Sequence, residues 1–156
     1  AGELDPLIVD VAAEHDVPYV AMHMKGDPRT MQSMTDYRDI VAEVVDYFRE
    51  RTAQLRERGV RRIVVDPGFG FAKTLEQNYE LLRGLHRLAE LGYPVLAGVS
   101  RKSMIYKLLG TTPAEALNGT TALHWECLRQ GAVILRAHDT REAVEVVRMF
   151  DQFMQA

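Results

Sequence analysis

Apolar residues follow two alternating patterns along this chain. Short, nearly continuous β-branched runs alternate with longer segments in which apolar residues recur every three or four positions. The runs predict strands buried on both faces of a parallel sheet, and the longer segments predict amphipathic helices whose apolar stripes belong to the core. The predicted strands cover residues 18–23, 62–66, 94–98 and 132–136. The clearest stripes are Tyr37, Ile40, Val41, Val44, Val45, Phe48 and Leu55, then Leu75, Tyr79, Leu82 and Leu85, and then Ala143, Val147, Phe150 and Met154.

Glycine and proline mark the boundaries of these elements. A glycine just before a strand typically ends the preceding helix in the left-handed conformation, and three glycines occupy such positions, namely Gly59, Gly92 and Gly131. Pro113 predicts the start of a further capped helix. The pair Asn118-Gly119 predicts a break, after which a helix covers about residues 122–130.

The alternation of strands and helices predicts the fold class. It is typical of a parallel sheet with helices outside it, here in one α/β domain over residues 1–156. Two architectures have this pattern, the doubly wound open sheet and the (β/α) barrel. Four strands cannot close an eight-stranded barrel, which takes roughly 250 residues. Because the chain also begins with a helical pattern, we expect either a small α/β sheet or part of a larger fold.

The composition is that of an ordinary globular domain, and it argues against some classes of function. Of the 156 residues, 47% are hydrophobic and 26% are charged, and the net charge is −3. A general nucleic-acid or membrane-surface binder is therefore not expected. No apolar run is long enough to span a membrane, the chain does not start with a signal peptide, and there is a single cysteine, Cys127. These features favour the cytoplasm.

The fourth predicted strand ends in a pattern typical of anion binding. Side chains alternate along a strand, so Arg136 and His138 share one face. The next helix begins at once with Asp139-Thr-Arg-Glu142, a capping-box pattern in which Asp139 is the cap. Two cationic or protonatable groups beside the positive end of a helix indicate an anion site. The alternative is an arginine and a histidine in ordinary surface ion pairs.

The second predicted strand ends in Asp66-Pro-Gly-Phe-Gly-Phe71. Glycines at positions 68 and 70 allow the backbone to approach a ligand, and we expect Phe69 and Phe71 to cover a flat ligand or the mouth of a barrel. An ionised carboxylate only accepts hydrogen bonds, so Asp66 suits a ligand edge with two adjacent N–H donors, as in a guanidine-like heterocycle. The alternative is that Asp66 caps the turn that follows it.

The first and third strand ends carry positive charge and hydroxyl groups. After the first strand, Gly26-Asp27-Pro28 predicts a turn flanked by Lys25 and Arg29. After the third strand, the segment Ser100-Arg-Lys-Ser103 offers two hydroxyls and two cations to an oxyanion or a ring carbonyl. The alternatives are an ordinary basic loop and a helix start with a solvated charge cluster. Because parallel strands place their carboxyl ends together, we expect the four loops to surround one small, polar, anionic or heteroaromatic ligand.

Other catalytic patterns are absent from the sequence. The five histidines lack the spacing of a zinc site, and there is neither a dinucleotide-binding glycine motif nor a Walker loop. Ser100 and His138 could be neighbours, but nothing in the sequence marks Ser100 as an activated nucleophile.

Together the loops resemble those of the dihydropteroate synthases of folate biosynthesis. The matching stretches occur in the order and spacing of that family, and they are MHMKGDPRTMQ (22–32), DPGFGFAKT (66–74), GVSRKSMI (98–105), LNGTTAL (117–123) and ILRAHD (134–139). The resemblance covers essentially the whole chain. It implies a TIM (β/α)8 barrel, of which this chain resembles only the carboxyl-terminal half, with a leading helix and four parallel strands each followed by a helix.

The resemblance implies a transferase that condenses 6-hydroxymethyl-7,8-dihydropterin pyrophosphate with p-aminobenzoate and releases pyrophosphate. In such enzymes a carboxylate matching Asp66 binds the amino and N–H edge of the pterin. Three residues match catalytic positions: Lys102 beside the pterin ring, and Arg136 and His138 on the leaving pyrophosphate. The substrate-binding positions match Met22, Asp66, Phe71, Gly98, Ser100, Lys102, Ser103, Arg136 and His138.

The resemblance also implies a Mg²⁺ cofactor and a cytoplasmic homodimer without a nucleic-acid or membrane partner. The metal-binding asparagine of the family belongs to its amino-terminal half, which this chain does not match, so no metal ligand is assigned here. We therefore expect the chain to be part of a longer protein and to be inactive by itself.

Two other functions stay open. Another pterin-binding barrel, such as a methyltetrahydrofolate:corrinoid methyltransferase, would share the carboxylate but would need neither the Arg136/His138 pair nor the Ser-Arg-Lys-Ser loop. The second is a non-catalytic half-barrel that serves as a binding module. The unmatched amino-terminal half favours this module, whereas four intact loops favour an enzyme.

Overall fold

The computed structural model describes residue 5, residues 7–26 and residues 34–156. A helix precedes the first strand and a helix follows each strand, as the sequence pattern predicts. The elements are α1 (Leu7–Glu14), β1 (Tyr19–Met22), α2 (Ile40–Glu57), β2 (Ile63–Asp66), α3 (Leu75–Arg83), α4 (His86–Ala89), β3 (Leu96–Ala97), α5 (Ser103–Leu109), the short 3-10 helix η2 (Pro113–Glu115), α6 (Leu117–Arg129), β4 (Ile134–Leu135) and α7 (Thr140–Gln155).

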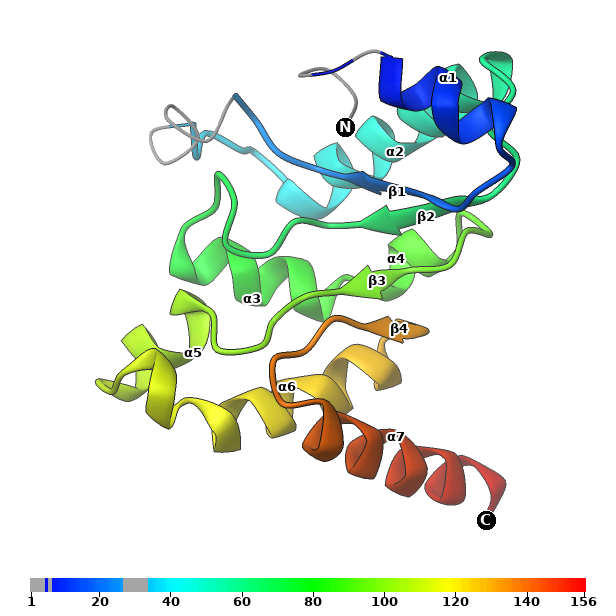
Figure 1. Cartoon of the computed structure of the whole chain (residues 1–156). Helices are drawn as coiled ribbons and strands as arrows, with labels where there is room; N and C mark the ends of the chain where they lie inside the picture. The colour runs from blue at the N-terminus through cyan, green and yellow to red at the C-terminus, as the bar shows by residue number, and fades with distance from the viewer. Residues whose placement is uncertain (1–4, 6, 27–33) are drawn as a thin grey trace.

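The four strands are parallel and lie side by side in chain order. β1 pairs with β2 along both strands, with Met22 opposite Asp66, and β3 pairs with β4. A parallel bridge between Val65 and Val95 joins the two pairs. All four strands therefore end at the same edge, and the loops that follow them lie together on the left of Figure 1.

Local signals in the sequence set the ends of the helices. Gly59, Gly92 and Gly131 have φ values of 87°, 79° and 95°, so each adopts the left-handed conformation predicted for a helix stop. At the other end, α2 begins where the Asp39 carboxylate accepts the Ala42 N–H at 2.9 Å. These stops and starts bring the chain back to the sheet after each helix.

The core lies between the sheet and the connecting helices. The predicted stripe of α2 is buried as a whole, apart from Tyr37, which precedes the helix and is partly buried. Leu81, Leu85 and Leu88, from α3 to α4, are fully buried beside it. The amino-terminal helices lie at one end of the molecule and α7 at the other (Figure 1).

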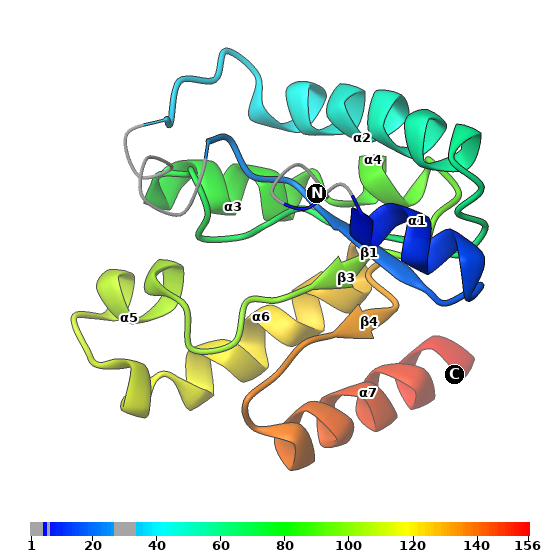
Figure 2. The ribbon, with the colours of Figure 1, turned by 45° about the horizontal axis from the view of Figure 1, so that its top comes forward.

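Helices α6 and α7 form a pair next to β4. They lie side by side in both views (Figures 1 and 2), and the ring of Trp125 meets Phe150 and Phe153 edge-on at centroid distances of 5.3 and 5.6 Å. The predicted apolar stripe of α7 holds at Ala143, which is buried, and is wrong at Met154, which is 66% exposed. The carboxyl-terminal turns of α7 thus extend beyond the core.

The predicted burial of all strands on both faces is wrong at the two ends of the sheet. Val20 of β1 is 45% exposed and Ile134 of β4 is 38% exposed, because each strand has a paired neighbour on one side only within the described residues. The inner strand β2 is buried throughout Ile63–Val65, as predicted.

The predicted helix break at Asn118-Gly119 is also wrong. Helix α6 runs without interruption over Leu117–Arg129. Gly119 lies where α6 meets α5, and a Cβ atom there would be 2.4 Å from Cγ2 of Ile105. The glycine is therefore a close-packing residue between two helices, and it does not end either of them.

Candidate active site

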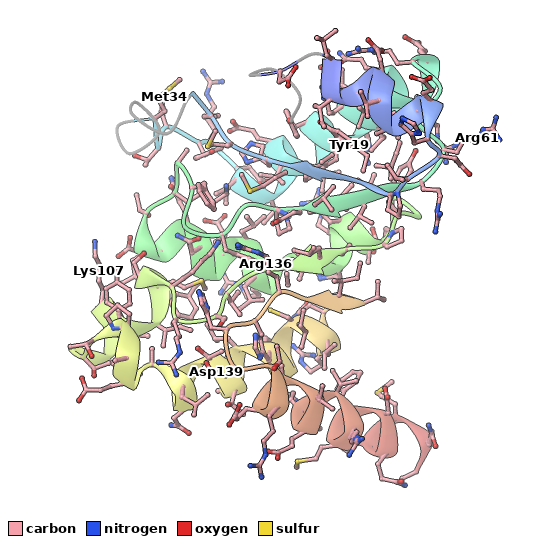
Figure 3. All side chains as sticks on the ribbon, viewed as in Figure 1. Tyr19, Met34, Arg61, Lys107, Arg136 and Asp139 are labelled. Atoms are coloured by element: carbon pink, nitrogen blue, oxygen red, sulfur yellow. The ribbon has the colours of Figure 1, made fainter. Side chains whose placement is uncertain are left out.

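The four strands bring the predicted residues to one edge of the sheet. Met22 and Asp66 are direct partners across β1 and β2. On the other strand pair, the Arg136 N–H donates to the carbonyl of Ala97 at 3.0 Å, which places Arg136 beside Gly98. Figure 3 shows Arg136 near the middle of the molecule, at the end of β4, with Asp139 below it at the start of α7.

Asp66 is the carboxylate of this edge. Its Oδ1 accepts the backbone N–H of Gly68 at 2.8 Å, so the role that was given as the alternative, a cap of the turn, is confirmed. Within the described residues no hydrogen bond reaches Oδ2, which leaves that oxygen for a ligand. Burial raises the pKa of the Asp66 carboxyl, and the Gly68 N–H together with the charges of Lys102, Lys73 and Arg136 opposes this rise. Asp66 therefore serves the turn and faces three cations.

The glycine loop after β2 requires its two glycines. Gly68 has a φ of 68°, and a Cβ atom there would lie 2.0 Å from the carbonyl oxygen of His23. Gly70 has a φ of 81°, and its N–H donates to Oδ1 of the buried Asn78 at 2.7 Å. The predicted cover by two phenylalanines is half wrong, because Phe69 is fully buried in the core and only Phe71 is partly exposed.

Lys73 holds this loop from inside, although no sequence pattern singled it out as a site residue. Its ammonium lies 2.9 Å from the Phe71 carbonyl, 3.0 Å from the Gly68 carbonyl and 3.1 Å from Nδ1 of His23. These three acceptors match the three protons of an ammonium group. Burial lowers the pKa of Lys73 to about 7, and the charge of Asp66 opposes that effect. The only signal in the sequence is a lysine inside an otherwise apolar and small-residue loop.

Lys102 connects the third loop to the second. Its ammonium donates to the carbonyl of Phe69 and lies 4.6 Å from the centroid of the Phe71 ring, a cation–π contact. Burial lowers the pKa of Lys102, while the charge of Asp66 raises it and that of Arg136 lowers it further. The acid, the two cations and the ring thus share one small region.

A cavity of about 190 Å³ opens at the end of β4. It is lined by Gly98, Ser100, Arg101, Lys102, Arg136, Ala137 and His138. Arg136 and His138 are both exposed at its mouth, as expected for alternate residues on one face of a strand. The cavity is lined by cationic side chains, by the imidazole of His138 and by the small residues Gly98 and Ala137, beside which the backbone is accessible. Cations and N–H donors of this kind bind oxyanions.

Ser100 and Arg101 support the loop that carries His138. The Ser100 hydroxyl lies 3.1 Å from the backbone N and 3.0 Å from Nδ1 of His138. Arg101 pairs with both oxygens of Asp139 at 2.8 Å and has a φ of 52°. The predicted capping role of Asp139 is therefore only partly right, because it is the N-cap residue of α7 but its side chain makes the ion pair and no cap bond. Ser100 is only 2% exposed, and its hydroxyl is engaged with His138, so it serves the loop and is not presented as a free nucleophile.

Ser103 lies next to this site, on a second cavity. That cavity measures about 500 Å³ and is lined by Thr35, Gly70, Lys73, Thr74, Leu75, Asn78, Ser103, Tyr106 and Lys107. Gly70 of the glycine loop lines it. Ser103 and Lys102 therefore face adjoining spaces, as two halves of one binding region would.

The basic loop after β1 is only partly described. Lys25 is engaged locally, since its ammonium lies 2.7 Å from the carbonyl oxygen of Asp36, 3.2 Å from Glu43 and 3.6 Å from the centroid of the Tyr37 ring. The predicted turn at Asp27-Pro28 and the charge of Arg29 lie outside the described residues.

A metal site is not formed by the part of the chain that the structure describes. No group of three or more His, Cys, Asp or Glu side chains in these residues could hold an ion. The described residues therefore do not fit the Mg²⁺ cofactor that the resemblance implies. Among the same residues, no helix has the length and apolarity to cross a membrane.

Comparison with known proteins gives a consistent result. Residues 1–138 match the family model described as "Pterin binding enzyme". The chain is 42% identical over 154 residues to the dihydropteroate synthase of Escherichia coli K12, covering 97% of this chain and 55% of that protein. For the dihydropteroate synthase of Synechocystis the identity is 43% over 150 residues, covering 94% of this chain and 52% of that protein. The chain thus spans about half the length of the curated relatives it matches.

Solved structures of dihydropteroate synthases have the same fold. The enzyme of Thermus thermophilus in complex with 6HMPPP superposes with a TM-score of 0.92 at 41% identity, covering 97% of this chain and 61% of that chain. The same enzyme has been solved with 4-aminobenzoate, with a TM-score of 0.91. A sulfonamide complex of the Yersinia pestis enzyme gives a TM-score of 0.93 at 34% identity, covering 97% of this chain and 56% of that chain.

Proposed function

Because the chain belongs to the pterin-binding enzyme family and matches the carboxyl-terminal part of dihydropteroate synthases, we propose that it contributes to dihydropteroate synthase activity. The reaction is the condensation of 6-hydroxymethyl-7,8-dihydropterin pyrophosphate with p-aminobenzoate, with release of pyrophosphate. One observation carries the proposal: Lys102 and Arg136 line the same cavity at the ends of β3 and β4, and their charges act on the Asp66 carboxylate at the end of β2. A single ligand with a donor-rich ring and an anionic tail would satisfy all three.

In this proposal Asp66 binds the pterin. The ionised carboxylate accepts from the 2-amino group and the adjacent ring N–H, while Oδ1 keeps its bond to Gly68. Lys102 is held beside the ring by the Phe69 carbonyl, and its charge stabilises the ionised form of Asp66. Met22, Phe71 and Gly98 would line the flat faces of the pterin. The turn thus fixes one oxygen of Asp66 and leaves the other to recognise the ligand.

Arg136 and His138 hold the pyrophosphate. Ionisation comes first: the bond between the pterin methylene carbon and the pyrophosphate oxygen breaks, and the electron pair leaves with the pyrophosphate. Arg136, His138 and the amino-terminal end of α7 stabilise the negative charge that develops there. The lone pair of the p-aminobenzoate nitrogen then attacks the methylene cation, and the nitrogen loses one proton to water. A neutral arylamine is nucleophilic enough to need no general base.

The p-aminobenzoate would occupy the space between the two cavities. Ser103 opens onto the larger one, and its hydroxyl is available to a carboxylate. Lys102 separates this space from the pyrophosphate site. In this proposal the arylamine lies on the pterin side and its carboxylate lies on the Ser103 side.

The remaining features of the proposal concern the whole protein. The four strands and their helices would form the carboxyl-terminal half of a TIM (β/α)8 barrel over residues 1–156, and the protein would act as a cytoplasmic homodimer. The high similarity to solved dihydropteroate synthases supports the half-barrel. The requirement for Mg²⁺ stays a prediction, since the described residues form no site for it.

The proposal is tested by ligand binding, because the chain spans about half of its relatives. Titration calorimetry should detect binding of 6-hydroxymethyl-7,8-dihydropterin pyrophosphate to the chain. The same pterin without pyrophosphate should bind more weakly. Asp66→Asn should weaken binding about 10- to 100-fold, as expected for loss of a hydrogen bond to a charged group. The control is Asp46→Asn, which changes an exposed carboxylate on α2.

Two results would contradict this function. Equal binding of the pterin with and without pyrophosphate would favour another kind of pterin-binding barrel. Equal effects of Asp66→Asn and Asp46→Asn would remove Asp66 from pterin recognition.

A further inference from the structure

We propose that Ser100 is a positioning residue that holds His138 as the Nε2–H tautomer, so that His138 meets an anion in the neighbouring cavity as a hydrogen-bond donor. The inference deepens the proposed function and rests on it, because it concerns the residue assigned there to the pyrophosphate. It also changes the predicted role of Ser100, from a residue that contacts the substrate to one that acts through His138.

The geometry ties the two residues together at two points. Ser100 Oγ is 3.1 Å from the backbone N of His138 and 3.0 Å from its Nδ1. Ser100 follows the buried end of β3 and is only 2% exposed. Two contacts between one hydroxyl and one histidine restrain both the backbone and the ring. The ring is therefore held in one orientation, with Nδ1 turned toward the protein interior.

The hydrogens of this pair follow from the properties of the three groups. A backbone N–H can only donate, so the Ser100 oxygen accepts from His138 N. Within the described residues, Nδ1 of His138 is the one remaining acceptor in reach of the Ser100 hydroxyl proton. The hydroxyl therefore donates to Nδ1, Nδ1 carries no hydrogen, and the ring proton of neutral His138 resides on Nε2.

The opposite tautomer would leave a buried donor without a partner. If Nδ1 carried the hydrogen, the Ser100 oxygen would accept from both nitrogens and its own proton would point at no acceptor. A buried unsatisfied donor of this kind shifts an equilibrium by about tenfold or more. Ser100 therefore favours the Nε2–H tautomer by about that ratio.

The tautomer decides what His138 presents to a ligand. His138 is exposed and lines the cavity of about 190 Å³ together with Arg136 and Lys102. With Nδ1 engaged, Nε2 is the nitrogen available to a bound anion. As Nε2–H it donates to a phosphate oxygen, whereas the other tautomer would direct a lone pair at that oxygen. Asp139, the residue after His138, forms an ion pair with Arg101 in which Nη2 lies 2.8 Å from Oδ1. This ion pair keeps the loop that carries His138 in place.

The test reads the tautomer directly. Long-range ¹H–¹⁵N correlation spectra of the whole chain, recorded at a pH of about 8.5, where an ordinary histidine is neutral, distinguish Nδ1–H from Nε2–H. We expect Nε2–H for His138 in the parent and in Ser100→Thr, which keeps the hydroxyl. Ser100→Ala should change the tautomer ratio about tenfold. The exposed His15 in the same spectra is an internal reference, and His138→Asn identifies the signals.

A pyrophosphate titration of the same samples separates this inference from the proposed function. Ser100→Ala should weaken pyrophosphate binding in proportion to the fraction of His138 that no longer carries the Nε2–H. For an even mixture of the two tautomers this loss is about twofold. An Nδ1–H tautomer in the parent, or an unchanged ratio in Ser100→Ala, would overturn the role of Ser100. A loss far above twofold with an unchanged tautomer would also overturn it. If the tautomers behave as expected but the parent does not bind pyrophosphate, the proposed anion site fails and the coupling of Ser100 to His138 stands.

Discussion

His23 should make the protein sensitive to mild acid. The side chain is 3% exposed and lies 3.1 Å from the Lys73 ammonium, with the ring of Tyr47 at a centroid distance of 4.9 Å. Burial, and after it the charge of Lys73, lowers the pKa of His23 from 6.5 to about 3. Protonation of the folded protein at this ring would place two positive charges in contact.

The magnitude follows from proton linkage. Between pH 6.5 and about pH 3 the unfolded chain binds a proton at His23 and the folded chain does not, so the free energy of unfolding falls as the pH falls. At pH 5 the proton bound by the unfolded chain lowers the free energy of unfolding by RT ln(1 + 10^1.5), which is about 2 kcal/mol. At pH 7.5 this contribution is close to zero. The stability provided by neutral His23 is thus fully present above pH 6.5 and is lost progressively below it.

Urea unfolding at pH 7.5 and pH 5 measures this difference. With a urea dependence of about 2 kcal/mol per M, the His23 contribution lowers the midpoint by about 1 M. Far-UV circular dichroism follows the whole chain, and the fluorescence of Trp125, which packs against α7, gives a second probe.

The matched variant is His23→Asn, which keeps a polar atom near the position of Nδ1 but does not titrate. It should be less stable than the parent at pH 7.5, because the ring is lost, and its midpoint should fall less between the two pH values. Carboxylates and the buried His124 titrate in both proteins, so their effects cancel in the comparison. The reasoning is wrong if His23→Asn and the parent lose the same free energy between pH 7.5 and pH 5.

Two further predictions concern the loops at the strand ends. Gly68→Ala should lower the free energy of unfolding by more than about 2 kcal/mol, because left-handed strain adds to the overlap with a backbone carbonyl. Gly92→Ala, with open space around the new Cβ atom, should lower it by only about 1 kcal/mol. Equal urea midpoints for the two variants would contradict this. Arg136→Ala should weaken pyrophosphate binding about 10- to 100-fold in calorimetry. Arg61→Ala, at the right-hand edge of the molecule in Figure 3 and away from Arg136, should not. Similar losses in both variants would indicate a general effect of charge.

The sequence by itself determined the framework. The alternation of β-branched runs with helical stripes predicted four parallel strands and the helices between them, because those periods reflect which side chains a strand or a helix buries. The glycine before β2 was predicted as a helix stop for a local reason, its left-handed conformation. The residues at the strand ends, such as Asp66 and Arg136, could be selected because parallel strands end at one edge.

Patterns that depend on neighbours in space were predicted less well. Gly119 looked like a break and proved to be a contact between α5 and α6, since the sequence does not show which helix lies against it. Asp139 has the pattern of a helix cap, but a guanidinium from the third loop competes for its carboxylate and forms the stronger, charge-assisted pair. The stripe of α7 was placed wholly in the core, although its last turns pass beyond the sheet.

Only the tertiary structure decided how the candidate site is held together. Lys73 is buried among three acceptors that come from two separate loops, and Ser100, which follows β3, reaches His138, which follows the neighbouring strand β4. Hydrogen bonds of this kind depend on distances of about 3 Å between residues far apart in the chain, and no local pattern encodes such distances. The sequence therefore specified which chemical groups stand at the edge of the sheet, and the packing of the strands and loops specified which of them face a ligand and which support the others.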